Sequence, residues 1–202
     1  SNLSLNNIRV NLAVINSKEV SKDDIFFTIK GKKKDAHKYL FEVFKKKASL
    51  AIVNRFSEKL KKTRQLKVTN TLKFLTDCAR IYRKNLDTKI ITITGSAGKT
   101  SLKDMLGSTL KKFYPTSYSK KSFNNKYGVP LSLFNIDIKD NFGVLEAGMD
   151  RKGEINFLSN IIKPDVGVIT NISFAHIKNF KSLLEIARAK GEIINNIKDY
   201  GF

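Results

Sequence analysis

Residues 90–101 read IITITGSAGKTS, and this stretch changes character halfway along. Lys89–Thr94 is a short apolar run rich in β-branched residues, which is typical of a buried parallel strand. A glycine turn follows over Gly95–Thr100. Ser101–Phe113 then carries apolar residues at 102, 105, 106, 110 and 113, a helical spacing. The order strand, glycine turn, helix predicts an α/β unit with a ligand site at the turn.

The turn has the chemistry of a phosphate-binding loop. Glycines allow backbone N–H groups to approach phosphate oxygens, and a helix N-terminus adds partial positive charge. Lysine supplies a full charge, and a hydroxyl directly after it can bind Mg²⁺. The common phosphate loop has four residues between its glycines, whereas this one has two, and an ordinary strand–turn–helix connection is the alternative. The predicted nucleotide-binding residues are Gly95, Ser96, Ala97, Gly98, Lys99, Thr100 and Ser101.

The strand–helix alternation continues along the chain. The sequence predicts strands at 142–147 and 165–172 and helices at 153–162 and 181–197. Such alternation favours a doubly wound parallel sheet, in which ligands bind at the carboxyl ends of the strands. Glu146 and His176 follow two of these strands, so with Thr100 they form a candidate metal site. The alternatives are a solvent-facing or helix-capping Glu146 and a structural His176.

The first 85 residues indicate a smaller α/β unit. Short strands are predicted at 10–15, 25–29, 51–53 and 66–68, with a helix over 71–84. Asp35 is a candidate N-cap of a helix whose apolar side is Tyr39, Leu40, Val43 and Phe44. The predicted domains are therefore residues 1–85 and 86–202.

Composition sets further limits. The chain has 202 residues, 38 basic and 18 acidic side chains, and a net charge of +20, which raises the hypothesis of nucleic-acid binding. However, 31 of the basic residues are scattered lysines, so lysine-rich solvated surfaces or a polyanionic small ligand are favoured. The single cysteine, Cys78, excludes an internal disulfide and favours a reducing, cytoplasmic setting. No apolar run reaches the roughly 20 residues of a membrane span.

Four segments together resemble the Mur ligase family. They are TGSAGKTS (94–101), SFNNKYGVPLSL (122–133), VLEAGMDRKGEI (144–155) and ITNISFAHIKNFKSLLEIARAKGEI (169–193). In that family too, the two glycines of the loop are separated by two residues. NSKEVSKDDIFFTIKGKKKDAHKYLFEVFKKKASLAIV (16–53) is similar to the family's uridine-nucleotide-binding domain. The resemblance covers almost the whole chain and implies an N-terminal substrate domain followed by a P-loop ATPase domain.

The resemblance implies an ATP- and Mg²⁺-dependent amide ligase of peptidoglycan synthesis, and hence of cell shape and division. Its substrates would be UDP-MurNAc-tripeptide and D-Ala-D-Ala, joined through an acyl phosphate. The pair Ala175-His176, where related ligases have Asp-His, favours this D-Ala-D-Ala-adding branch. Another Mur-type ligase or a basic nucleic-acid-binding P-loop module is the alternative. We expect a monomer that binds no nucleic acid and does not insert into membranes.

The resemblance also implies roles for individual residues. Lys99 would contact the ATP β- and γ-phosphates, Thr100 and Glu146 would hold Mg²⁺, and His176 would serve a second metal ion. Asn124 and Asn125 would lie beside the reacting groups, although a polar turn before Gly128 is the alternative. Lys190 would become a metal-binding carbamate, which requires a neutral amine, although a surface lysine is the alternative. The expected uridine-diphosphate site comprises Ser17, Lys18, Lys30, Gly31, Asp35 and His37.

Two departures from the family pattern stand out. Asp150 and Arg151 follow Glu146-Ala147-Gly148-Met149, where the family often has asparagine or serine and then histidine. The family has three domains, and the sequence ends just after the predicted Lys190 helix. We therefore expect a fragment that cannot catalyse ligation by itself.

Overall fold

The computed structural model describes residues 10–31, 35–119, 121–174 and 179–201. The chain divides into two compact units, residues 1–77 and 78–202. The division falls inside helix α2 (Thr71–Lys84), before the boundary at residue 85 that the sequence analysis gave. Among the described residues, no helix combines the length and apolar character needed to cross a membrane.

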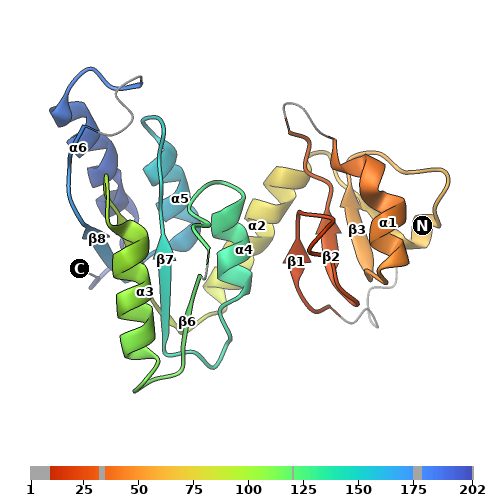
Figure 1. Ribbon diagram of the computed structural model, residues 1–202, viewed down its shortest axis with the longest axis horizontal. Helices are drawn as coiled ribbons and strands as arrows, with labels where there is room; N and C mark the ends of the chain where they lie inside the picture. Colours follow the sequence, from red (N-terminus) through yellow and green to blue (C-terminus); the bar gives the residue numbers. More distant parts are fainter. Residues whose placement is uncertain (1–9, 32–34, 120, 175–178, 202) are drawn as a thin grey trace. The chain divides into compact units, whose positions relative to one another are not determined.

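The first unit is built on a parallel four-stranded sheet of order β1-β2-β3-β4 (Figure 1). Its strands are β1 (Ala13–Val14), β2 (Ile25–Phe27), β3 (Leu50–Val53) and β4 (Gln65–Lys67). The short 3-10 helices are η1 (Ala36–Tyr39) and η2 (Lys62–Arg64), and α1 (Leu40–Lys45) follows η1. Leu40 and Val43 of α1 are buried with Phe26 and Ala51, as the apolar spacing predicts. The strands are present but shorter than expected at β1 and β2.

The second unit contains another parallel sheet, of order β6-β7-β5-β8 (Figure 1). Its strands are β5 (Lys89–Thr94), β6 (Thr116–Tyr118), β7 (Phe142–Glu146) and β8 (Val166–Ile169). Ile93 of β5 pairs with Glu146, and Thr94 pairs with Ile169. The carboxyl ends of β5, β7 and β8 therefore meet at one edge of the sheet. The sequence analysis missed β6, a short edge strand.

Helices cover both faces of this sheet, which confirms the predicted doubly wound architecture. They are α3 (Lys99–Leu110), α4 (Gly128–Phe134), α5 (Glu154–Ile162) and α6 (Leu183–Gly191), followed by the 3-10 helix η4 (Glu192–Asn196). The last turns of α2 join α4, α5 and α6 in one apolar core with Ile90 and Leu145. Because side chains alternate along a strand, Glu146 points to the other face, where it meets α3.

The buried face of α3 differs from the prediction. The apolar spacing pointed to positions 102, 105, 106, 110 and 113, yet Met105 is 63% exposed and Phe113 is 73% exposed. The fully buried side of the helix carries Lys103 and Gly107 instead. Gly107 is required because a Cβ there would lie 2.4 Å from the ring of Tyr118 in β6. The predicted positions Leu102, Leu106 and Leu110 are half-buried on this same side. The apolar spacing therefore predicts the helix and part of its packed face, but not the two residues that are fully buried.

Candidate active site at the end of the second sheet

The predicted phosphate loop connects β5 to α3. Gly95 has φ +148° and Gly98 has φ +78°, conformations that favour glycine. A Cβ on Gly95 would also lie only 1.8 Å from Thr170 Oγ1, so no side chain fits there. The helix begins at Lys99, two residues earlier than expected. The glycines are therefore where the backbone turns sharply, as the sequence indicates.

The first part of the loop is tied to the segment after β8. Asn171 Oδ1 accepts hydrogen bonds from the amides of Ser96 (3.1 Å) and Ala97 (3.0 Å), and Thr170 Oγ1 donates to Ala97 O (2.6 Å). The first-turn amides of α3, at Lys99, Thr100 and Ser101, have no intrahelical acceptor and are the donors suited to phosphate. Asn171 is thus a loop-holding residue that the sequence analysis did not select, because only the fold brings residues 96 and 171 together.

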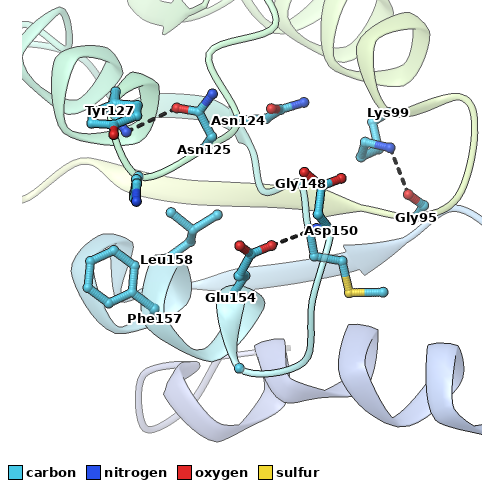
Figure 2. A pocket seen from close by; sticks show the side chains of 13 residues that line it. Gly95, Lys99, Asn124, Asn125, Tyr127, Gly148, Asp150, Glu154, Phe157 and Leu158 are labelled. Carbon is cyan, nitrogen blue, oxygen red and sulfur yellow. Dashed lines mark hydrogen bonds between the residues drawn. The ribbon is translucent and has the colours of Figure 1, made fainter. Parts of the chain in front are cut away.

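Lys99 lies at the rim of a cavity of about 610 Å³. Its Nζ donates to Gly95 O at 2.7 Å (Figure 2). Asn124, Asn125 and Tyr127 line one side of the cavity, and Glu154, Phe157 and Leu158 of α5 line the other (Figure 2). The cavity is a suitable space for the groups that react beside a bound nucleotide.

The side chains of the neighbouring residues Asn124 and Asn125 make different hydrogen bonds. Asn125 Oδ1 accepts hydrogen bonds from the amides of Tyr127 and Gly128, both at 3.0 Å, so its side chain forms the turn into α4. This is the polar-turn alternative considered for the pair. Asn124 instead donates from Nδ2 to Glu146 Oε2 at 3.4 Å, and its carbonyl accepts from the Gly148 amide at 2.7 Å. Asn124 therefore connects the cavity with the carboxylate at the end of β7.

Glu146 is almost fully buried, with 1% of its surface exposed. Lys103 Nζ of α3 lies 3.4 Å from Glu146 Oε1. The solvent-facing alternative for Glu146 is therefore wrong. Among the described residues, Glu146 Oε1 has no hydrogen-bond partner. A buried carboxylate oxygen without a hydrogen bond is an observation that fits a cation ligand.

Thr100 lies in the first turn of α3, and its Oγ1 is 3.2 Å from Ser122 Oγ. Hydroxyl and carboxylate oxygens suit Mg²⁺, so Thr100 and Glu146 fit the predicted set chemically. His176, the third expected ligand, lies outside the described residues. In the part of the chain that the structure describes, no group of three His, Cys, Asp or Glu side chains is arranged to hold a metal. The phosphate oxygens of a nucleotide and water molecules are further ligands of the kind that Mg²⁺ takes.

Lys190 is buried in α6, with 2% of its surface exposed, so the surface-lysine alternative is wrong. Burial, together with the positive charge of Lys99, lowers the pKa of Lys190 to about 8. A neutral amine is thus accessible near neutral pH, which is the condition that carbamate formation requires. The electrostatic effect of Lys99 also means that Lys190 lies near the phosphate loop.

In the first unit, Asp35 and His37 form a connected group. His37 Nδ1 lies 2.7 Å from Asp35 Oδ1, the His37 Nε2 lies 3.2 Å from Thr28 Oγ1, and the His37 amide donates to Asp35 Oδ1. Asp35 caps η1, as predicted, and Lys30 bridges to it through the backbone. Burial raises the pKa of Asp35, but hydrogen bonds from His37 and Arg55 outweigh that effect and hold the pKa well below its usual range.

A cavity of about 290 Å³ adjoins this group, lined by Asp35, His37, Lys38, Arg55, Phe56 and Ser57. Arg55 Nη2 donates to Asp35 Oδ2 at 2.5 Å. The sequence analysis did not select Arg55, which follows β3 and meets Asp35 only through the fold. The carbonyls of the expected residues Ser17 and Lys18 both accept hydrogen bonds from Lys46 Nζ, and the Lys18 amide donates to Asn16 Oδ1. Gly31 is exposed at the end of the described segment 10–31.

The second unit has the fold and the glycine loop that are typical of α/β domains that bind nucleotide phosphates. Comparison with known families gives its relatives. The sequence model described as the Mur ligase middle domain matches residues 93–202, and the chain belongs to the Mur ligase family.

Curated relatives and solved structures agree with this assignment. The UDP-N-acetylmuramoyl-tripeptide–D-alanyl-D-alanine ligase of Rickettsia prowazekii is 37% identical over 191 residues, which cover 95% of this chain and 42% of the relative. The enzyme of the same name from Buchnera aphidicola is 36% identical over 94% of this chain and 41% of its own length. The chain thus spans about two fifths of the length of these relatives.

The structure of MurF from Acinetobacter baumannii matches with a TM-score of 0.86 and 34% identity, over 96% of this chain and 42% of that one. MurF ligase from Thermotoga maritima, solved in complex with ADP, matches with a TM-score of 0.82 and 32% identity, over 95% and 44%. These matches confirm the predicted α/β fold and the resemblance to the family.

Proposed function

We propose that the protein containing this chain is an ATP-dependent amide ligase of peptidoglycan precursor synthesis, which joins D-Ala-D-Ala to UDP-MurNAc-tripeptide. The curated relatives carry this activity in their names, and the structural relative with ADP supports ATP as the nucleotide. We propose further that the enzyme works in the cytoplasm as a monomer, with Mg²⁺, and binds neither nucleic acid nor membrane.

One observation carries this proposal: the buried carboxylate of Glu146 lies at the same sheet edge as the glycine loop. Ile93, two residues before that loop, pairs with Glu146, and Asn124 connects Glu146 to the cavity that Lys99 also lines. Helix N-terminal amides, a lysine and a buried carboxylate near one another support a site for a nucleotide phosphate and a cation. Phosphoryl transfer needs this combination of fixed positive groups around a transferring phosphate.

The residues of the second unit divide the work. The first-turn amides of α3 and Lys99 hold the phosphates of ATP, while Asn171 keeps the loop in shape. Thr100 and Glu146 would hold Mg²⁺, which when bound adds positive charge against the transferring phosphoryl group. His176 and Lys190, the latter as a carbamate, complete the proposed set. Asn124 and Asn125 are proposed to border the reacting groups.

The reaction proceeds in two balanced steps. The terminal carboxylate of the tripeptide attacks the γ-phosphorus of ATP, the bond to the bridging oxygen breaks, and ADP leaves with an acyl phosphate formed. The amino group of D-Ala-D-Ala then attacks the acyl carbon, loses a proton and releases inorganic phosphate. Two anions meet in the first step, and the positive charges of Lys99 and of the bound Mg²⁺ would offset their repulsion.

The first unit is proposed to bind the UDP part of the substrate. Lys30, Gly31, Asp35 and His37, with Ser17 and Lys18, are the expected residues, and Arg55 adds a guanidinium at the same cavity. Lysine and arginine side chains suit a diphosphate, because they supply charge and hydrogen bonds together.

The test is a ligation assay with the full-length protein. ATP, Mg²⁺, D-Ala-D-Ala and UDP-MurNAc-tripeptide should give UDP-MurNAc-pentapeptide and one phosphate per bond formed. UDP-MurNAc-dipeptide with a single amino acid, and a folate with glutamate, serve as rival substrate pairs. Turnover of either rival pair but not of the tripeptide would contradict the proposed substrate.

A further inference from the structure

Lys103 is a lysine that is 0% exposed, and neither the phosphate-loop motif nor the proposed reaction uses it. It lies on α3 one turn after Thr100, on the side of the helix that packs against β7. A lysine is rarely buried to this extent unless it has a charged partner. The question is therefore what its ammonium group does beside the proposed cation site.

The ammonium of Lys103 has two acidic neighbours. Its Nζ is 3.4 Å from Glu146 Oε1 and 3.1 Å from Asp104 Oδ1, but Asp104 is half exposed whereas Glu146 is buried. Within the described residues, neither Lys103 Nζ nor Glu146 Oε1 has a hydrogen-bond partner. Lys103 and Glu146 are thus opposite charges in contact, without a directional bond that would fix the carboxylate.

The buried charge nearest to Glu146 is the ammonium of Lys103, which also contacts the half-exposed Asp104. Lys99 adds a second positive charge at the cavity that Asn124 joins to Glu146. A buried carboxylate needs such a counter-charge, because an uncompensated charge in the interior is strongly unfavourable. The same counter-charge repels a second cation that approaches the carboxylate.

We propose that Lys103 is a resident counter-ion of Glu146 that keeps this edge from binding a bare divalent cation and makes cation binding depend on nucleotide phosphates. The inference rests on the proposed nucleotide and cation site. The negative charges of a bound triphosphate offset those of Lys99 and Lys103, and its oxygens add ligands to those of Thr100 and Glu146. Lys103 thereby acts through Glu146 and does not touch the reacting atoms.

The experiment measures Mn²⁺ binding, as a spectroscopic substitute for Mg²⁺, by the electron paramagnetic resonance signal of free Mn²⁺. The full-length protein is titrated at fixed pH, alone and with a non-hydrolysable ATP analogue. The variants are Lys103→Met, which removes the charge, and Lys103→Arg, which keeps it. Lys103→Met combined with Glu146→Gln tests whether the effect passes through the carboxylate. Circular dichroism checks that each variant is folded.

We expect the wild-type protein to bind Mn²⁺ weakly alone and much more tightly with the analogue. Removing one charge about 6 Å from a divalent cation changes its affinity about tenfold even at the dielectric constant of water. Lys103→Met should therefore bind Mn²⁺ at least about tenfold more tightly without nucleotide, with a smaller gain on adding the analogue. Lys103→Arg should behave like the wild type, and the double variant should lose the tenfold gain.

A folded Lys103→Met protein whose nucleotide-free Mn²⁺ affinity is unchanged or weaker overturns the inference. If Lys103→Met does not fold, Lys103→Gln, which also removes the charge, replaces it in the nucleotide-free titration, and Mn²⁺ affinity equal to that of the wild type overturns the inference. Failure of the proposed function is distinguishable, because the wild-type protein would then not bind the ATP analogue at all, with or without metal.

Discussion

Arg83 Nη2 donates a hydrogen bond to Asp165 Oδ2 at 2.8 Å, and this contact joins the last turn of α2 to the start of β8. The guanidinium is only 2% exposed and also donates to the carbonyls of Ile162, Leu86, Thr88 and Lys163. Asp165 Oδ2 in turn accepts from the Ile90 amide at 2.8 Å. One arginine thus provides hydrogen bonds to several backbone carbonyls and to the Asp165 carboxylate in the second unit.

Replacing Arg83 by methionine should destabilise the second unit by about 3 kcal/mol, because Asp165 loses its buried and closest cationic partner and several carbonyls lose a donor. Lys89 and Lys198, at 3.6 and 3.5 Å from Asp165 Oδ1, are more exposed and compensate only in part. Urea denaturation of the full-length protein measures the loss. The double variant Arg83→Met with Asp165→Asn should recover part of it, because both charges are gone. A single variant within about 0.5 kcal/mol of wild type, the range of ordinary surface changes, would contradict this account.

Gly95→Ala should disrupt the phosphate loop. A Cβ there would overlap Thr170 Oγ1, and φ +148° strains any other residue. Such strain alone costs about 1–3 kcal/mol, so ADP affinity should fall by about fivefold to 150-fold if the strain is relieved by distorting the loop. Calorimetric titration with ADP measures the change. Gly191→Ala is the matched control, because open space surrounds that glycine and its φ is −59°; equal ADP affinity in both variants would refute the packing argument.

Lys190 should form a carbamate that nuclear magnetic resonance detects with ¹³C-bicarbonate at pH 8. With a pKa of about 8, about half of the Lys190 amines are neutral at that pH, against well under 1% for an ordinary lysine. Lys190→Met should lack the carbamate signal. A wild-type spectrum that matches that of the variant would remove the chemical basis for a carbamate ligand.

The same lysine should make stability depend on pH in a defined direction. The folded protein releases the Lys190 proton near pH 8, whereas the unfolded chain holds it up to about 10.5. Between these values the unfolded state binds more protons, so the contribution of Lys190 to stability rises with pH. Lys190→Met should flatten that rise in urea midpoints measured from pH 8 to 10. A steeper rise in the variant would show that the sign is wrong.

Asp35→Asn should weaken binding of the UDP-linked substrate. The carboxylate holds both His37 and Arg55 at the cavity of the first unit. Losing charge-assisted hydrogen bonds to both should lower the affinity about three- to tenfold, as measured by calorimetry on the full-length protein. Asp77→Asn is the control, since it makes the same chemical change in an exposed ion pair, with Lys73 of α2. If both variants bind the substrate equally well, Asp35 does not organise the site.

Local sequence patterns predicted much of the second unit because their signals do not depend on distant residues. Three local signals each specify their own backbone: the β-branched run of β5, the helical spacing of apolar residues along the fourteen residues of α2, and the glycine loop. The order of these elements then gave a parallel sheet, and with it a shared edge for Thr100 and Glu146. The short elements β6 and α4 escaped because three to seven residues carry too little periodicity.

The sequence by itself therefore determined the strand–loop–helix backbone, since glycine conformations and apolar periods are local properties. The tertiary structure decided which side chains are buried and what they meet. Lys103 looks like any exposed helical lysine until packing of α3 on β7 places it against Glu146. Asn171 and Arg55 likewise gain their partners only when segments far apart in the chain come together. Burial and charge pairing depend on such distant neighbours, so no local pattern can encode them.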